Sequence, residues 1–150
     1  MSENQLTIGW IGVGVMGKSM CKHLLKKGYK LLVNTRTPAK AQEVIEAGGV
    51  FHTQTEIATH ADIIFLMLGY PKDVEEVVLG IDGILKHMKK GASLVDHTTS
   101  SPDLAAKIAL ACKEKGIHCL DAPVSGGDIG AQNGQLVTMC GGEKEAFDQL

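Results

Sequence analysis

Five short apolar segments recur along this 150-residue chain, and stretches with helical spacing separate them. The segments are apolar almost throughout, which is typical of strands buried on both faces, whereas half-exposed strands alternate apolar with polar residues. They cover residues 6–11, 30–33, 63–68, 93–95 and 118–120. We therefore predict an α/β fold in which a doubly wound, mainly parallel sheet is flanked by helices.

The stretches between the strands carry helical spacing over residues 19–27, 39–47, 72–78 and 103–115. Pro38 and Pro102 stand where first helical turns would begin, and Gly28 and Gly116 stand where helices would end. Residues 143–150 look like the first two turns of a further helix. Because no repeat, low-complexity tract or linker divides the chain, we expect one domain over residues 1–150.

Bulk properties exclude several classes of partner. The net charge of −2 gives no electrostatic footprint for nucleic acid or an anionic membrane. The longest apolar run, residues 63–68, is far shorter than the ~20 residues of a membrane span, so we expect a cytoplasmic protein. The cysteines lack a Cys-x-x-Cys pair and zinc-ligand spacing to histidine, which predicts reduced thiols in or near the core and no metal site. They are Cys21, Cys112, Cys119 and Cys140.

The glycines Gly12, Gly14 and Gly17 follow the first predicted strand with the spacing Gly-x-Gly-x-x-Gly and precede a predicted helix. In a strand–turn–helix unit the first glycine permits a tight turn, the second lets the backbone approach a pyrophosphate, and the third lets helix and strand pack closely. The helix N-terminus adds unpaired N–H groups. This pattern predicts a Rossmann-type dinucleotide site formed by Gly12, Val13, Gly14, Val15, Met16 and Gly17. The alternative is a turn that only requires positive φ.

The end of the second predicted strand bears on which dinucleotide is bound. An NAD site usually carries an acidic residue there to accept hydrogen bonds from the ribose. This chain has no acid at that point and instead has hydrogen-bonding side chains around one arginine, which could clamp a 2′-phosphate. The residues are Asn34, Thr35, Arg36 and Thr37. We therefore predict NADP as the cofactor, with NAD and an exposed turn arginine as the alternatives.

Four stretches of the chain together resemble the β-hydroxyacid dehydrogenases, which include 3-hydroxyisobutyrate dehydrogenase and tartronate semialdehyde reductase. The resemblance covers essentially all 150 residues, and its most specific part is the last stretch. The stretches are "IGWIGVGVMGKSM", "RTPAKA", "IIFLMLGYPKDVEEV" and "LDAPVSGGDIGAQNGQLVTMCGG". The resemblance implies an oxidoreductase that transfers a hydride between a nicotinamide cofactor and a small 3-hydroxy acid or the matching semialdehyde.

The resemblance also implies roles for residues beyond the glycine loop. Met67 and Leu68 would line the nicotinamide side, in a loop that we expect to be looser because Gly69 replaces the family's usual proline. In the loop 96–102, Thr98 would approach both nicotinamide and substrate, with Thr99 as the second choice. For His97 we expect an exposed position and no acid–base role.

The stretch that begins at Ser125 resembles the family's substrate signature. Ser125 offers a hydroxyl, and Gly126 and Gly127 leave their backbone N–H groups unshielded, an arrangement suited to a carboxylate. The resemblance implies the same role, which is binding the substrate carboxylate beside the nicotinamide. Apart from the resemblance, the alternative is a plain glycine-rich turn.

The resemblance places the proton-donating lysine on a helix beyond Leu150, so we expect no catalytic residue in this chain. It also implies a C-terminal all-helical domain that these residues lack, and a homo-oligomeric full-length protein. Residues 1–150 alone would then bind NADP(H) without turnover. Two alternatives remain, a stand-alone dinucleotide-binding or interaction module without catalysis and a 6-phosphogluconate dehydrogenase.

Overall fold

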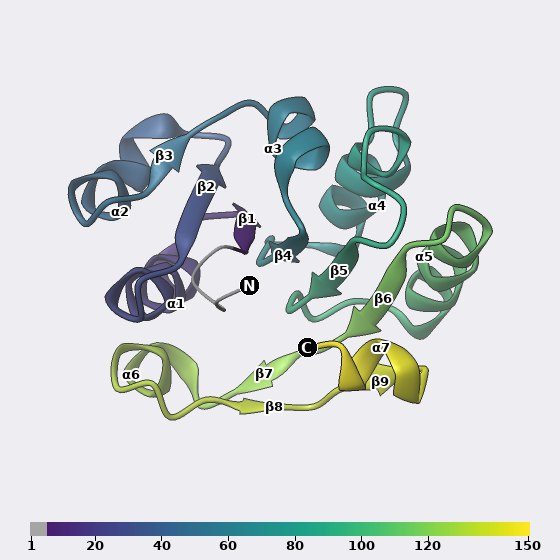
Figure 1. The fold of residues 1–150 in the computed structure, drawn as a ribbon. Coiled ribbons are helices and arrows are strands. Elements are labelled where there is room, and N and C mark those ends of the chain that lie inside the picture. Colours follow the sequence, from purple (N-terminus) through teal and green to yellow (C-terminus); the bar gives the residue numbers. More distant parts are fainter. Residues whose placement is uncertain (1–5) are drawn as a thin grey trace.

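Residues 6–150 are described by a computed structural model, in which seven strands form the central sheet (Figure 1). The strand order is β3-β2-β1-β4-β5-β6-β9; β9 runs antiparallel to β6, and the other neighbours pair in parallel. The strands are β1 (Thr7–Ile11), β2 (Lys30–Asn34), β3 (Val50–Phe51), β4 (Ile63–Leu66), β5 (Ser93–Asp96), β6 (His118–Asp121) and β9 (Gly141–Gly142). The order 3-2-1-4-5-6 is that of a doubly wound Rossmann sheet, so the predicted fold class is confirmed.

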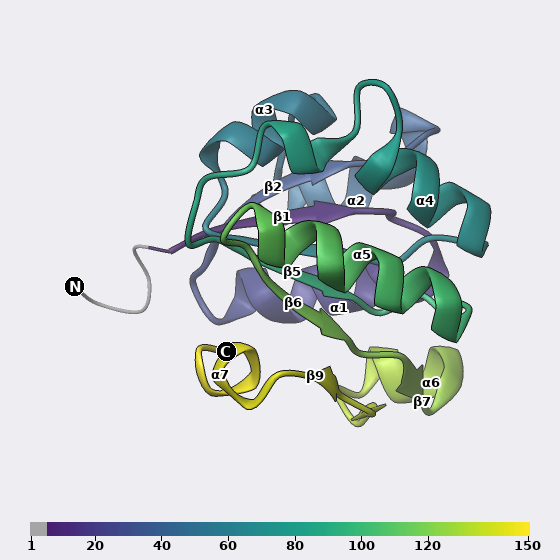
Figure 2. The same cartoon turned by 90° about the vertical axis from the view of Figure 1, so that its right-hand side faces the viewer.

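Helices cover both faces of this sheet. In Figure 1, α3, α4 and α5 lie on one side, and α1, α6 and α7 lie on the other, as the turned view of Figure 2 also shows. The helices are α1 (Val15–Lys26), α2 (Gln42–Glu46), α3 (Gln54–His60), α4 (Pro71–Leu79), α5 (Pro102–Glu114), α6 (Gly127–Gln132) and α7 (Lys144–Asp148), with short 3-10 turns η2 (Pro38–Ala41) and η3 (Ile84–Lys86). A separate pair of short strands, β7 (Val124–Ser125) and β8 (Val137–Thr138), flanks α6.

Helix α5 illustrates how the sequence specifies these elements. Pro102 occupies its first turn, and the Ser101 side chain caps it by accepting a hydrogen bond of 3.2 Å from the Leu104 N–H. Leu104, Ile108 and Cys112 then recur every four residues and are buried against the sheet. This apolar stripe and the capped start explain why the helix was predictable almost to the residue.

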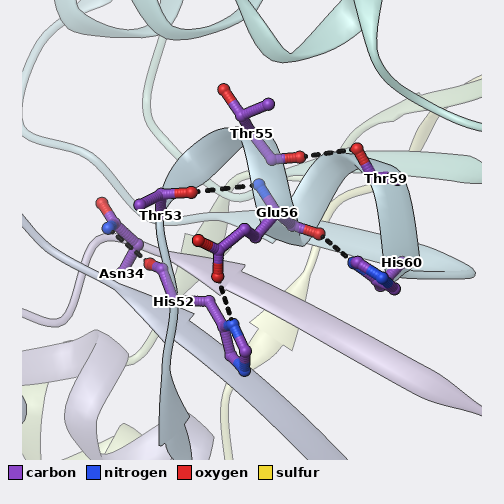
Figure 3. Close-up of polar contacts among 7 residues, drawn as sticks. All are labelled: Asn34, His52, Thr53, Thr55, Glu56, Thr59 and His60. Atoms are coloured by element: carbon purple, nitrogen blue, oxygen red, sulfur yellow. Dashed lines mark hydrogen bonds and ion pairs between the residues drawn. The ribbon is translucent and has the colours of Figure 1, made fainter.

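Helix α3, together with β3, was not among the predicted elements. Only Ile57 and Ala58 of α3 are buried, so its hydrophobic pattern is too short to reveal a period. The helix depends on its start instead, because the Thr53 side chain accepts a hydrogen bond of 3.1 Å from the Glu56 N–H (Figure 3). Just before it, the Asn34 amide donates to the carbonyl of His52 at 2.8 Å, which ties the end of β2 to the start of α3.

Other boundaries differ from the predicted ones. Helix α1 begins at Val15, directly after Gly14, and not at residue 19. The strand predicted to reach residue 68 ends at Leu66. The helix predicted over 39–47 is divided into η2 and α2. Residues 143–150 do contain a helix, α7, as expected.

Two predictions about burial are wrong. His97 is buried, with 7% of its surface exposed, because its ring packs against Trp10 and Phe65 at centroid distances of 5.9 and 5.5 Å. The ring hydrogen-bonds through Nδ1 to the carbonyl oxygen of Ala122 at 2.7 Å, and burial lowers its pKa. The prediction of thiols in or near the core fails at Cys140, which is exposed. It holds for Cys21 and Cys112, while Cys119 is half-buried.

Candidate functional site

A cleft of about 450 Å³ lies beyond the carboxyl ends of β1, β2 and β4. In open α/β sheets, ligands bind outside these strand ends, at the point where the strand order reverses. Most of the residues predicted to hold the cofactor line this cleft, namely Gly12, Val13, Gly14, Asn34, Thr35, Arg36, Thr37, Met67 and Leu68. Val15 lines a neighbouring hollow that shares Val13 and Gly14.

The three glycines of the loop differ in what surrounds them. Gly12 has a φ of +105°, and a Cβ atom there would overlap the carbonyl oxygen of Met67. A Cβ atom at Gly17 would overlap the carbonyl oxygen of Gly12. At Gly14 a Cβ atom would meet nothing within 4 Å. The first and third glycines are therefore required by packing, whereas the second leaves open space at the start of α1.

The N-terminus of α1 supplies hydrogen-bond donors to this open space. Val15, Met16 and Gly17 form the first turn of the helix, and the N–H groups of a first turn have no partner inside the helix. No acidic side chain lies in this turn. An anion placed beside Gly14 would meet unpaired N–H donors and the positive end of the helix dipole.

At the β2 end of the cleft, one polar side chain is held by hydrogen bonds and another is exposed to solvent. Asn34 is engaged on both sides, because its amide donates to the His52 carbonyl and its Oδ1 accepts from the Gln54 amide at 3.4 Å. Arg36 is free of such packing, with 82% of its side chain exposed. Its guanidinium reaches across to Asp73 on α4, where Nη2 lies 3.2 Å from Oδ1.

Thr98, which was predicted to contact the cofactor, does not line the cleft and instead joins two loops behind Leu68. Its hydroxyl oxygen accepts a hydrogen bond of 2.8 Å from the Leu68 N–H, and its own N–H donates to Asp96 Oδ1 at 2.9 Å. Thr98 is only 2% exposed, whereas the adjacent Thr99 is exposed. Thr98 thus fixes the loop after β4 against the loop after β5, and Thr99 is the threonine open to solvent.

Asp96 is a buried acid beneath this loop contact. Burial raises the pKa of Asp96 to about 6, the hydrogen bonds from Thr98 oppose this rise, and the charge of Asp121 adds to it. Asp121 lies beside Asp96 in the register of β5 and β6, and burial raises its pKa too. Two neighbouring carboxyl groups are therefore held under the loops that frame one end of the cleft.

Ser125, Gly126 and Gly127 lie outside the cleft, where β7 passes into α6. Ser125 is exposed, and Gly126 and Gly127 have φ values of +132° and +63°, which favour glycine at both positions. The segment is held against α1, because His23 Nε2 lies 2.8 Å from the carbonyl oxygen of Ala131 on α6. Since β7 follows directly on β6, these residues sit at the same carboxyl edge of the sheet as the glycine loop (Figure 2).

Several residues that line the cleft were not singled out from the sequence. Lys40 comes from η2, four positions after the predicted Arg36, and Gln54 comes from α3. Tyr70, Lys72 and Asp73 come from the start of α4. Asp73 is 37 positions away from Arg36, so no local spacing could have indicated their contact.

A comparison with family profiles matches residues 7–150 to the NAD binding domain of 6-phosphogluconate dehydrogenase. The chain belongs to this family of NAD-binding domains. This match confirms the predicted dinucleotide-binding class of domain, and the roles of the cleft, the glycine loop and the start of α1 stay predictions.

Individual relatives carry oxidoreductase names. An "Uncharacterized oxidoreductase" of Bacillus subtilis is 57% identical over 95% of this chain and 50% of its own length. "Probable 3-hydroxyisobutyrate dehydrogenase-like 1, mitochondrial" of Arabidopsis thaliana is 47% identical over 100% of this chain and 46% of its own. The chain therefore spans about half the length of the curated relatives it matches.

Solved structures also match this chain over about half of their own length. A structure described as "Psf3 in complex with NADP+ and 2-OPP" is 29% identical and superposes with a TM-score of 0.90 over 95% of this chain and 51% of that one.

Within the part of our chain that the structure describes, no helix is long and apolar enough to cross a membrane. Residues 6–150 also hold no cluster of three or more metal-ligating side chains.

Proposed function

We propose that this NAD-binding domain is the NADP(H)-binding part of a β-hydroxyacid dehydrogenase, which moves a hydride between the nicotinamide and a small 3-hydroxy acid or its semialdehyde. The observation that carries the proposal is the open space at Gly14, which faces the unpaired N–H groups of α1 inside a cleft of about 450 Å³. The name of the Arabidopsis relative supports this substrate class.

NADP is favoured over NAD by the charges around the cleft. Arg36, Lys40 and Lys72 all line it, and no acid follows β2 directly. A 2′-phosphate would find there a guanidinium that can bind it in a bidentate manner. The NADP+ complex of the structural neighbour supports the same choice. NAD remains the alternative.

The residues of this chain would hold the reactants, and the cofactor, when bound, would supply or accept the hydride. Met67 and Leu68 would form the wall on the nicotinamide side, fixed by Thr98. Ser125 with the N–H groups of Gly126 and Gly127 would bind the substrate carboxylate. Because Thr98 is only 2% exposed, the exposed Thr99 is the better candidate for contact with substrate.

Three further expectations extend to the whole protein. The proton donor to the carbonyl oxygen is proposed to be a lysine outside residues 1–150, so these residues alone would bind cofactor without turnover. A homo-oligomeric state of the full-length protein and a cytoplasmic location also remain predictions. The Arabidopsis relative is named as mitochondrial, so measuring the location has value of its own.

Cofactor titration of the 150-residue chain tests the proposal. Trp10 is the single tryptophan, and its indole N–H donates to the carbonyl oxygen of Gly12 at 3.1 Å, so its fluorescence reports on the glycine loop. We expect saturable changes with both NADPH and NADH, and tighter binding of NADPH. Absence of saturable binding of either cofactor would contradict the proposed function.

Replacing Arg36 with alanine should separate the two cofactors. Loss of a charge-assisted contact to the 2′-phosphate, worth about 1.5–3 kcal/mol, should raise the Kd for NADPH by about 10- to 100-fold and change that for NADH little. Lys30→Ala is the matched control, because it removes an exposed positive charge from the opposite end of β2. Equal weakening of both cofactors in Arg36→Ala would refute the assignment of Arg36 to the 2′-phosphate.

A further inference from the structure

Asp73 is the acid that the cleft does carry. It lies in the first turn of α4, and among the described residues that line the cleft it has the only negatively charged side chain. Its side chain is 14% exposed, compared with 82% for Arg36, its partner at 3.2 Å. The Asp73 carboxylate is therefore largely buried in the wall of the cleft, and Arg36 is the exposed residue that extends to it.

The Arg36–Asp73 contact crosses the cleft. Arg36 stands in the loop after β2, whereas Asp73 stands on α4, which follows β4 on the far side of β1 in the sheet order. Both residues line the same 450 Å³ space. Lys40 and Lys72 also line it, but it is Arg36 that forms the ion pair with Asp73. The cation proposed to clamp the 2′-phosphate is thus the one that Asp73 engages.

This pairing gives Asp73 opposite effects on the two cofactors. A 2′-phosphate and the Asp73 carboxylate compete for the same guanidinium, so the phosphate has to displace Asp73 before Arg36 can bind it. The ribose of NAD carries a neutral hydroxyl at that position, which can donate a hydrogen bond to a carboxylate. Asp73 therefore penalises NADPH and tolerates NADH.

We infer that Asp73 is a specificity-determining residue that holds Arg36 across the cleft and so limits the preference for NADPH over NADH. The inference rests on the proposed function, because it requires the cofactor to bind in this cleft. It assigns to α4 the acidic group that NAD sites usually carry at the end of β2, where this chain has none.

The test is the ratio of the Kd values for NADPH and NADH in Asp73→Asn, which removes the charge and keeps the size. We expect NADPH binding to tighten by about 10-fold, or about 1.4 kcal/mol, and NADH binding to stay equal or weaken. Asp73→Ser serves as a second variant, with thermal unfolding followed for both. Asp82→Asn is the control, since it removes an exposed acid beyond the end of α4 and outside the cleft.

A double variant shows whether the effect passes through Arg36. In the Arg36→Ala background, Asp73→Asn should change NADPH affinity by no more than about twofold, since coupled groups are not additive. The inference is overturned if Asp73→Asn leaves the NADPH-to-NADH ratio unchanged, or if its full effect persists without Arg36. Failure of the proposed function would show differently, as no binding of either cofactor to the unmodified chain.

Discussion

Replacing Gly14 with valine is expected to abolish cofactor binding while the chain stays folded. The position has extended backbone (φ −90°, ψ −160°) that any residue can adopt, and a Cβ atom there meets nothing within 4 Å. The added side chain would fill the space reserved for the pyrophosphate. We expect the Kd for NADPH to rise by more than about 100-fold, and a loss of stability of only about 1 kcal/mol from a poorer N-cap residue. Fluorescence titration and thermal unfolding measure the two effects.

Gly17→Ala is the matched control for this prediction, because it adds one methyl group to the same loop in a different environment. Its Cβ atom would overlap the carbonyl oxygen of Gly12, so the backbone of α1 would have to move away from β1. Overpacking of this kind costs about 1–3 kcal/mol of unfolding free energy. The two variants should therefore separate binding from folding. Normal NADPH affinity in a folded Gly14→Val chain would contradict the role of the loop in binding the cofactor.

The sequence was sufficient for the central strands and the principal helices, because their signals are local. Continuous apolar runs indicated β1, β2, β4, β5 and β6, and proline or glycine marked the end of α1 and both ends of α5. The strands β3, β7, β8 and β9 have two residues each, which is too few to show a period. Their pairing is decided by the fold around them, so they were missed.

In the candidate site too, local spacing predicted some residues, while contacts between distant residues could not be predicted. The glycine loop and Arg36 were identified because their spacing from a strand is fixed by local geometry. The contacts of Asp73 with Arg36 and of Thr98 with Leu68 join residues 37 and 30 positions apart, and only the folded chain shows them. His97 was misplaced for a related reason. A single polar residue gives no indication that two aromatic rings from other strands will cover it.

The buried acid Asp96 should make the stability of the chain depend on pH in an unusual direction. Its pKa is about 6 in the folded state and close to 3.8 in the unfolded state, so the folded state binds a proton more tightly. The stabilisation from this proton is complete below about pH 4 and is lost as pH rises through 6. A rise of about two pKa units corresponds to about 3 kcal/mol of unfolding free energy. An acid whose pKa is lowered in the folded state has the opposite effect, because its contribution to stability is lost as pH falls. Asp62 is such an acid.

Asp96→Asn is therefore expected to raise the free energy of unfolding at pH 7.5, by up to about 3 kcal/mol, and to change it little at pH 4. Asparagine keeps the oxygen that accepts from the Thr98 N–H and removes the charge that burial and Asp121 disfavour. Denaturant unfolding of both chains between pH 4 and 7.5 measures the difference, and Asp82→Asn, at an exposed position, controls for the loss of one negative charge. If Asp96→Asn lowers stability equally at both ends of this range, the carboxylate serves the fold through its hydrogen bonds alone. A gain in unfolding free energy that is confined to neutral pH shows instead that the buried charge of Asp96 destabilises the fold. The same carboxylate nevertheless accepts the hydrogen bond from Thr98, whose hydroxyl contacts Leu68.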